Sequence, residues 1–548
     1  MGMVLRIYRR KKLRPLAERI VMIRVNGIRV PLGQDLGDLA AICEKKFRIK
    51  RSRIKRARLA KKSVDARKKS DVHFIISIDI EADGEEGILK AVKNAVRIEK
   101  KPYVIPQAVG TGLRPVIVGF GPAGMFAALV LAMAGARPVI LERGDDVDTR
   151  CRKVEEFRRT GVLDTECNVQ FGEGGAGTFS DGKLNTGISD ERIGWIFERL
   201  VEFSAPEEIL YLAKPHIGTD KLRGAVKRLR ERVISLGGEV MFGARLCGIT
   251  CENGAVSGAD FIRNGVTEHI QTDSVILAAG HSARDVFELM KNMDISLSQK
   301  NFSVGVRIEH RRTDIDKAMY GQFAGHKALK AADYKLAVHL PNGRTLYTFC
   351  MCPGGYVVAA SSERDRLAVN GMSCFARDAD NSNSALLVNV NTDDYGSDDP
   401  LAGMYLQRDI EERAFRAGGG GYSAPVATVG EFLSGKLTGT LGKVTPSYLP
   451  AYKHALPDDY LPGFVCESLR MGITEMGKKI QGFDSPDAVL TGAETRSSSP
   501  VRIDRGSDMQ SLSLRGLYPC GEGAGYAGGI VSAAVDGMKC AEAVLNKG

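Results

Sequence analysis

The stretch VIVGFGPAGMFAALVLAMAGARPVILE, residues 116–142, decides the fold of this chain. Residues 116–118 and 138–141 are short and apolar, as strands of a buried sheet are, and the segment between them predicts a glycine turn followed by a helix. That helix is apolar all round, which is typical of a helix buried against a parallel sheet. We therefore expect an α/β chain built on a doubly wound parallel sheet.

The glycines of GFGPAG have separate tasks in a Rossmann-type dinucleotide-binding turn. Gly119 permits the tight turn, Gly121 lets the backbone approach a pyrophosphate, and Gly124 lets helix and strand pack closely. The phosphates would face the helix N-terminus, whose unpaired N–H groups favour an anion. Glu142, 18 residues after Gly124, is placed to accept from both ribose hydroxyls and to repel a 2′-phosphate. The alternative is a glycine turn in an empty βαβ unit.

Three later segments favour FAD over NAD as the nucleotide. GEGGAGTFSDGK, residues 172–183, offers small residues and hydroxyls that can surround a flavin or its ribityl chain. VILAAGHSARD, residues 275–285, brings a second turn to the nucleotide, and CGEGAGYAGGI, residues 520–530, opens a helix whose N-terminus can stabilise negative charge on the flavin pyrimidine edge. The predicted cofactor contacts are Gly119, Gly121, Pro122, Ala123, Gly124, Glu142, Arg143, Gly174, Gly175, Thr178, Ser180, Leu246, Ala279, Gly280, Gly521, Glu522, Gly528, Gly529 and Ile530.

These motifs carry a resemblance to known flavoproteins. GFGPAG with Glu142, LAAG at 277–280 and CGEGAGYAGGI together resemble the glutathione-reductase-type FAD fold, which has the same three motifs in the same order. FCMCPGGYVVAA at 349–360, TGAETRSSSPVRI at 491–503 and the basic N-terminal segment resemble a bacterial family of FAD-dependent proteins described as NAD(FAD)-utilizing dehydrogenases. The resemblance covers nearly the whole chain and implies an FAD-dependent oxidoreductase. The chain departs from the broader pattern at Glu522, where Asp is commoner, and at Ala279, where Thr is frequent.

Three residues are candidates for the chemistry itself. His281 follows the AAG turn, so it is expected near the cofactor, and its alternative role is a hydrogen-bonded turn residue. Arg496 can bind a carboxylate or phosphate with its planar fork, or it forms an ion pair for which Glu494 is a candidate partner. Cys352, with Cys350, precedes a Pro-Gly-Gly turn that can aim it into a cleft, although a buried inert thiol is the commoner outcome. No zinc or iron–sulfur spacing is present, so no metal site is expected.

Composition shifts along the chain predict its domains. Residues 1–100 are expected to form a basic, ferredoxin-like α+β domain with strands near 22–31 and 72–80 and helices near 38–47 and 85–96. Residues 101–114 are expected to be a linker because Pro and Gly interrupt both periodicities. An FAD-binding domain would then comprise residues 115–290 and 501–548, including a final helix at 530–545. Between its two parts, residues 291–500 are strand-rich and predict an inserted mixed α/β substrate domain.

Charge and hydropathy limit the function classes. The net charge is +11, but residues 1–101 carry 28 Lys and Arg against 12 Asp and Glu, which leaves the rest of the chain slightly acidic. This basic segment is either a nucleic-acid contact or a solvated face, and we favour the second. No apolar run is long enough to cross a bilayer and no secretory leader is visible, so we expect no membrane contact and a cytoplasmic location. The eleven cysteines, scattered and odd in number, favour reduced thiols.

We therefore expect an FAD-dependent dehydrogenase that transfers hydride between a small-molecule substrate and the flavin. NADH or NADPH is a candidate second partner. Since no second strand–GxGxxG–helix unit follows, a nicotinamide would reach the flavin through the substrate cleft. Two alternatives stay open: an FAD-dependent RNA-modifying enzyme and a non-catalytic flavin-binding protein. The sequence sets neither the substrate nor the oligomeric state.

Overall fold

The computed structural model describes residues 20–100, 102–107 and 112–547. The first 19 residues of the expected N-terminal domain and residues 101 and 108–111 of the expected linker lie outside the described residues. The chain divides into two compact units, and residues 211–213 belong to the first of them although most of that unit precedes residue 105. None of the described helices is long and apolar enough to cross a membrane.

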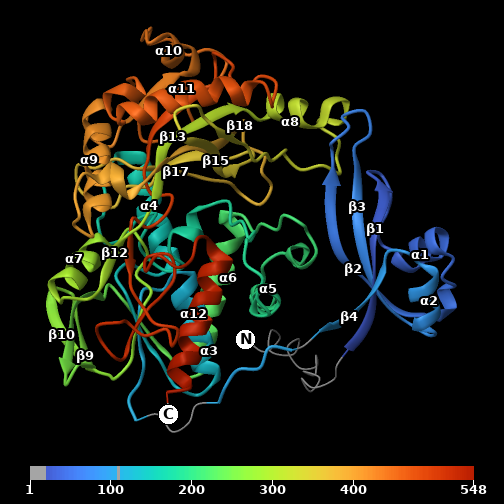
Figure 1. Cartoon of the computed structure of the whole chain (residues 1–548), viewed down its shortest axis with the longest axis horizontal. Helices are drawn as coiled ribbons and strands as arrows, with labels where there is room; N and C mark the ends of the chain where they lie inside the picture. Colours follow the sequence, from blue (N-terminus) through green and yellow to red (C-terminus); the bar gives the residue numbers. More distant parts are fainter. Residues whose placement is uncertain (1–19, 101, 108–111, 548) are drawn as a thin grey trace, which may run out of the picture. The chain divides into compact units, whose positions relative to one another are not determined.

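The first unit is a small α+β structure with a four-stranded antiparallel sheet in the order β2-β3-β1-β4 (Figure 1). Its elements follow the βαββαβ order of a ferredoxin-like unit. Ile23, Val25, Ile76, Ile78 and Ile80 are buried in it because alternate residues of a strand share one face. The elements are β1 (Ile20–Pro31), α1 (Leu39–Phe47), β2 (Ile54–Asp65), β3 (His73–Ala82), α2 (Glu85–Ala91) and β4 (Ala95–Lys100).

Two segments of this unit differ from the expectation. The helix predicted over 85–96 ends at Ala91, because residues 95–100 form β4 and pair with β1. In that strand Val96 and Ile98 alternate with Arg97 and Glu99, and this period of two is the signal of a strand. The long strand β2 was not predicted, because its run of Lys and Arg residues resembles a solvated basic segment.

The second unit contains a five-stranded parallel sheet in the order β23-β11-β5-β6-β7. The strand order reverses beside β5, and in such sheets ligands bind in the crevice at the carboxyl ends of the strands at this point. The predicted strand–turn–helix–strand at 116–142 forms β5, α3 and β6 of this sheet. The strands are β5 (Val116–Val118), β6 (Val139–Glu142), β7 (Glu239–Phe242), β11 (Val275–Leu277) and β23 (Leu517–Pro519).

The two faces of the parallel sheet are covered differently. Helices α3, α6 and α12 lie together on one side. Gly537 lets α12 approach α3 so closely that a Cβ on Gly537 would lie 2.0 Å from the Ala123 carbonyl oxygen. On the other side Val116, Val118 and Val275 share a core with the small sheet β8–β10 and with α7. The covering elements are α3 (Pro122–Met133), α6 (Thr219–Ser235), α7 (Arg284–Asn292), α12 (Ile530–Leu545), β8 (Arg245–Glu252), β9 (Ala255–Arg263) and β10 (Val266–Gln271).

Residues between about 300 and 494 build a separate seven-stranded sheet, which we call the cap sheet, in the order β14-β15-β18-β13-β21-β19-β20. Helix α11 packs on β14, β15 and β18 (Figure 1). The segment is mixed, with strands β13 (Phe302–Arg311), β14 (Ala337–His339), β15 (Thr345–Cys352), β18 (Asn381–Val390), β19 (Ala424–Thr428), β20 (Tyr452–His454) and β21 (Val489–Glu494), and helices α8 (Arg312–Tyr320), α9 (Ala402–Ala417), α10 (Val429–Ser434) and α11 (Gly463–Gly477).

The remaining elements of the second unit are short and connect these layers. The pairs β12–β22 and β16–β17 each form a two-stranded antiparallel ladder. Helix α5 packs against α12 beside the parallel sheet. Their bounds are α4 (Val147–Thr160), α5 (Arg192–Glu202), β12 (Leu297–Gln299), β16 (Tyr356–Ala359), β17 (Val369–Met372) and β22 (Val501–Ile503).

Candidate functional site

A cavity of about 680 Å³ lies within the second unit, at the carboxyl end of the parallel sheet. Its walls come from the turns after β5, β6, β11 and β23, from the segment 170–187, and from β15 and β21 of the cap sheet. This volume falls in the range of about 300–1,000 Å³ that is usual for small-molecule and cofactor sites. The cavity therefore lies at the sheet edge where the sequence predicts a nucleotide.

The glycine turn after β5 is built without room for side chains. Gly119 has φ +93°, and a Cβ there would lie 2.5 Å from the Ala278 carbonyl oxygen. A Cβ on Gly124 would lie 1.9 Å from the carbonyl oxygen of Gly119, so only glycine lets α3 start this close to β5. At Gly121 the nearest atom to such a Cβ, the Cα of Gly175, is 3.6 Å away. Gly119 and Gly124 are thus required for close packing, whereas the absence of a side chain at Gly121 leaves space in the cavity.

Glu142 ties three backbone segments of the cavity wall together. Its buried carboxylate accepts from the amide of Phe120 at 2.7 Å, and from the amides of Gly144 and Gly172 at 2.9 Å each. Such charge-assisted bonds are stronger than bonds between neutral groups. Glu142 therefore fixes the glycine turn, and its Oε2, which accepts only from Phe120 among these amides, retains a lone pair for a ribose hydroxyl.

A buried arginine that sequence reasoning missed shapes the segment 168–175. The guanidinium of Arg150, on α4, is fully buried and donates to five backbone carbonyls at 2.7–3.2 Å. Burial, which outweighs the attraction of nearby acidic groups and thiols, lowers its pKa to about 10. The acceptors are the carbonyls of Asn168, Val169, Gly172, Glu173 and Gly175. Arg150 thus holds in place the loop that forms one wall of the cavity.

Glu173, in the same loop, is buried with its carboxylate 3.3 Å from Arg230 Nε and accepting from the Val147 amide at 2.7 Å. Burial disfavours its charged form more than these contacts favour it, which raises the pKa of Glu173 to about 7. The side chain therefore titrates near neutral pH. In segment 172–183 only the small residues and hydroxyls indicated a flavin site, so neither Glu173 nor Arg150 was singled out from the sequence.

The C-terminal motif forms the opposite wall. Gly521, with φ +76°, donates its amide to Asp536 at 2.7 Å, and Arg505 holds that carboxylate at 2.7 Å. Gly528, Gly529 and Ile530 follow at the N-terminus of α12 and line the cavity. The N-termini of α3 and α12 thus both open on the same space.

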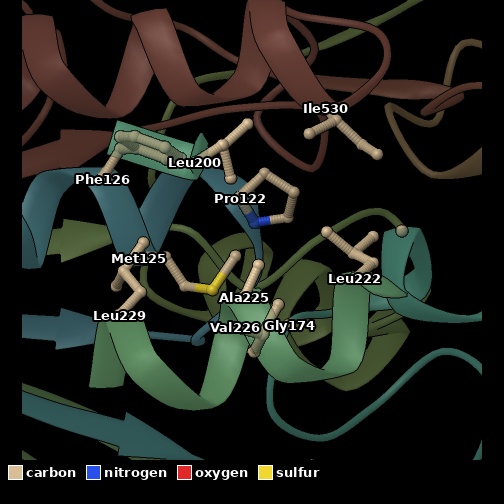
Figure 2. Close-up of a pocket in the computed structure, with 11 residues that line it drawn as sticks. Pro122, Met125, Phe126, Gly174, Leu200, Leu222, Ala225, Val226, Leu229 and Ile530 are labelled. Carbon is tan, nitrogen blue, oxygen red and sulfur yellow. The ribbon is translucent and has the colours of Figure 1, made fainter. Parts of the chain in front are cut away.

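Behind these two helix starts lies a small apolar void of about 10 Å³. Figure 2 shows Pro122 and Ile530, the first residues of α3 and α12, above the aliphatic side chains of α6. Because the void is about the size of one water molecule and its lining is apolar, it has neither the room nor the partners for a ligand. It belongs to the packing that holds the two helix N-termini beside each other.

Most of the predicted cofactor residues meet at the main cavity. The residues that line it are Gly119, Gly121, Pro122, Ala123, Glu142, Arg143, Gly175, Ser180, Leu246, Ala279, Gly280, Glu522, Gly528, Gly529 and Ile530. Four others stand behind the wall: Gly124, Gly174, Thr178 and Gly521. Thr178 is fully buried and its hydroxyl bonds the Glu173 carbonyl oxygen at 3.4 Å, so it supports the loop and does not face the cavity.

His281 lines the cavity and is nearly buried. Its Nδ1 lies 3.3 Å from a carboxylate oxygen of Glu522. Its Nε2 is buried and has no hydrogen-bond partner among the residues that the structure describes. An imidazole that lines a cavity beside a carboxylate is a candidate for exchanging a proton with a bound molecule.

Arg496 is committed to a structural ion pair. Its guanidinium donates from Nε and Nη2 to the two carboxylate oxygens of Glu411 at 3.0 and 2.9 Å, and from Nη1 to Ser362. The predicted pairing of Arg496 with Glu494 is wrong, because Glu494 accepts from Arg307 at 2.8 Å. Although Arg496 lines the cavity, its fork is already occupied, so the ion-pair alternative describes it and an anion-binding role does not.

Cys352 is buried, and its Sγ lies 3.2 Å from the Cys350 carbonyl oxygen. Burial raises the pKa of its thiol, so the sulfur is protonated at neutral pH and is a poor nucleophile. Its candidate catalytic role is therefore not supported, and the inert thiol is what the geometry shows. Cys350, at φ +39°, is the exposed member of the pair and lines the cavity.

Comparison with known proteins identifies the family. Residues 301–497 match the family model "FAD-dependent protein, C-terminal domain-like", and residues 22–81 match a domain of unknown function, DUF8436. An uncharacterized protein of Clostridium beijerinckii is 46% identical over 530 residues, which is 96% of this chain and 99% of the relative. The chain belongs to the same family as this relative, and its residues 301–497 carry the C-terminal domain that the model describes for FAD-dependent proteins. The predicted FAD dependence is confirmed at this level.

Solved flavoproteins resemble this FAD-dependent protein only remotely. A flavin-dependent brominase, Bmp2 in a triple-mutant form, is 12% identical with a TM-score of 0.37, over 79% of this chain and 80% of that one. A geranylgeranyl bacteriochlorophyll reductase-like protein of Thermoplasma acidophilum is 14% identical with a TM-score of 0.35, over 78% and 77%. Values this low assign neither fold nor reaction.

The residues of the cavity fit FAD on their own terms. The N-termini of α3 and α12 both face the cavity, the first for the pyrophosphate and the second for the flavin edge where reduction places negative charge. Gly121, Gly528 and Gly529 leave open space where a Cβ would otherwise stand. Glu142 is anchored beside the first turn for a ribose. A long anionic cofactor with a planar ring at one end matches this arrangement.

Proposed function

We propose that this FAD-dependent protein is an oxidoreductase that passes hydride between a small organic substrate and its flavin. The observation that carries the proposal is the single cavity in which two glycine-lined helix N-termini meet and which continues to β15 of the cap sheet. FAD supplies a two-electron acceptor of hydride when bound. The protein supplies binding, orientation and a proton.

The chain's own groups divide these tasks. The glycine turn held by Glu142 orients the nucleotide, and the α12 N-terminus favours negative charge at the flavin end. His281, whose Nδ1 lies 3.3 Å from a carboxylate oxygen of Glu522, is the residue that we assign to hold or accept a proton. His281 and Glu522 both line the cavity wall, so the proton need not come from bulk water. Leu246 and Ala283 add apolar surface that excludes water from the same wall.

The reaction test is anaerobic reduction of the purified holoprotein. NADH and NADPH are each added and bleaching of the yellow flavin band is followed by stopped flow. We propose NAD(P)H as the electron donor because the family resemblance suggests it and the cavity is open enough for a second ligand. If neither nicotinamide bleaches the flavin, that donor is removed from the proposal. If no chemical donor other than dithionite reduces it at a useful rate, the protein is a flavin-binding protein without this activity.

His281→Gln separates proton transfer from cofactor binding. The glutamine amide fills similar space but cannot shuttle a proton, and general acid–base catalysis is typically worth about 10²–10⁴-fold. We expect a full flavin content with turnover lowered by this factor and a flattened pH profile. Unchanged turnover would remove His281 from the mechanism. Arg364→Gln, at a residue outside the cavity lining, serves as the control.

A second candidate function, FAD-dependent modification of RNA, is favoured by one feature of the first unit. Strand β2 carries Lys55, Arg56, Arg58, Lys61 and Lys62 in the sequence IKRARLAKKSVD. Phosphate contacts by such side chains would make RNA binding fall steeply with salt. The measurement is retention of transfer RNA by the full chain across a salt series. Indifferent retention at low salt would dismiss this function.

A further inference from the structure

The end of the cavity formed with the cap sheet is rich in charged side chains. This part, which we call the cap end, is formed by the segment 181–187, by Lys214, by residues 333–335, by residues of β15 and β21, and by Arg496. None of the predicted cofactor contacts lies in it, whereas the catalytic candidates Arg496 and Cys352 do. Its charged lining residues are Asp181, Lys183, Lys214, Asp333, Lys335, Glu494 and Arg496.

Most of these charges are neutralised by partners. The carboxylates of Asp181 and Glu494 each accept from a buried guanidinium group. Asp181 accepts from Arg377, and Glu494 accepts from Arg307 at 2.8 and 3.2 Å. An ion pair in this state contributes little net charge to the cavity. The pairs are Asp181 with Arg377, Lys214 with Asp333, Arg307 with Glu494 and Arg496 with Glu411.

Lys183 is not neutralised in this way. Its Nζ lies 3.8 Å from a carboxylate oxygen of Asp181, beyond hydrogen-bond distance. That carboxylate already accepts from the Arg377 guanidinium and from the Ser373 hydroxyl. Lys335 is exposed and forms no ion pair within the described part of the chain. At the cap end Lys183 thus shares the Asp181 carboxylate with Arg377, and Lys335 forms no ion pair within the described residues.

The remaining surface of the cap end is apolar or uncharged. Phe349 is 40% exposed although it belongs to a cap-sheet strand, and Met351 lines the same wall. Asn185 and Thr186 add neutral polar groups beside Lys183. A cavity end that is lined by both an ammonium with three donors and an exposed ring suits a molecule with one anionic end and an apolar body.

We propose that the cap end binds the carboxylate of a small organic acid, with Lys183 as its anchor and Lys335 adding to the positive potential. The inference rests on the proposed function because the acid is the substrate of the same cavity. Lys183 donates a charge-assisted hydrogen bond to the carboxylate, and the apolar body lies against Phe349. Since the lining excludes much water, this interaction is stronger than the same pair would be in solvent.

The test uses the holoprotein with benzoate and benzamide as probes. The two molecules share shape and ring, and they differ in charge. Binding is measured by the change in the flavin absorption spectrum and by calorimetry. We expect saturable binding of benzoate that is at least about tenfold tighter than that of benzamide and that weakens with added salt. Binding of the two probes with equal affinity, or no saturable benzoate binding by either measurement, overturns the proposal.

Variants at Lys183 locate the anchor. Lys183→Gln is expected to weaken benzoate at least about tenfold and leave benzamide unchanged, whereas Lys183→Arg should recover part of the affinity. Lys291→Gln, which breaks an ion pair with Asp399 elsewhere in the unit, is the matched control and should change nothing. An unchanged benzoate affinity in Lys183→Gln overturns the assignment.

Flavin content keeps the two proposals separate. Lys183→Gln should retain the parent's ratio of FAD to protein, because Lys183 is assigned to the substrate and not to the cofactor. A variant that loses FAD would show that Lys183 binds the cofactor, which overturns the anion site. A parent protein that fails to bind FAD would instead overturn the proposed function, whatever the probes do.

Discussion

Replacing Glu142 by Gln tests the cofactor site most directly. The glutamine has nearly the same shape, so its oxygen can still accept from the amides of Gly144 and Gly172, now without the charge. Its NH₂ group, however, would face the amide of Phe120, which donates to the carboxylate at 2.7 Å. Two donors would then oppose each other in a buried place.

The free-energy cost of Glu142→Gln follows from the loss or weakening of these three hydrogen bonds. An unsatisfied buried N–H costs about 1–3 kcal/mol, and the two remaining bonds each lose part of their charge assistance, which together gives about 2–4 kcal/mol. Because FAD requires the ordered turn at residues 119–121, binding must supply this free energy. The expected dissociation constant of FAD rises about 30- to 1,000-fold.

The assay is fluorescence titration of deflavinated protein with FAD, for the parent and for Glu142→Gln. Glu252→Gln, at an exposed carboxylate at the end of β8, controls for the loss of one negative charge and should keep the parental affinity. A Glu142→Gln protein that binds FAD within about threefold of the parent would refute the reasoning.

Three further predictions concern the walls of the same cavity. Gly124→Ala should yield protein purified without flavin, because the new Cβ would lie 1.9 Å from the Gly119 carbonyl oxygen; a normal ratio of flavin to protein would contradict this. Arg150→Met should cost about 3–5 kcal/mol of unfolding free energy, since it leaves buried carbonyls unpaired, with denaturant melts as the measurement and an unchanged midpoint as the contrary result. Glu173 has a pKa of about 7 in the folded protein, above its ordinary value, so the folded state holds this proton more tightly; the linked stability is complete below about pH 4.5 and is lost as pH rises through about 7, by about 3 kcal/mol. Glu173→Gln should remove this slope from melting temperatures recorded between pH 5 and 8, and an identical slope in both proteins would show that another group titrates.

The local pattern of the sequence was sufficient for the cofactor half of the site. A glycine that must tolerate φ above zero, a helix that is apolar all round and a carboxylate at the end of the next strand each leave a mark within about 30 residues. Residues 116–142 therefore indicated β5, α3 and β6, and the motif at 520–530 indicated the start of α12 at Ile530.

Errors arose where a local pattern had two solutions. Residues 85–96 have a helix-forming start, yet Val96 and Ile98 pair with β1, because a strand that completes a sheet satisfies its backbone groups and a helix extension would not. Arg496 stands two residues from Glu494, so that carboxylate was the nearest candidate partner in sequence. Its actual partner is Glu411 on α9, a residue that lies 85 positions before Arg496 in the sequence.

What the sequence by itself determined is the glycine turn between β5 and α3 and the expectation of FAD, because backbone geometry at a phosphate site leaves few choices of residue. The tertiary structure alone decided which charged side chains form ion pairs and which line the cavity. Arg496, Glu494 and Asp181 form ion pairs with residues far along the chain. Arg150 is buried and donates to five backbone carbonyls. Lys183 and His281 line the cavity. The physical reason is that an ionic side chain is defined by its neighbours in space, and these come from segments that no local pattern connects.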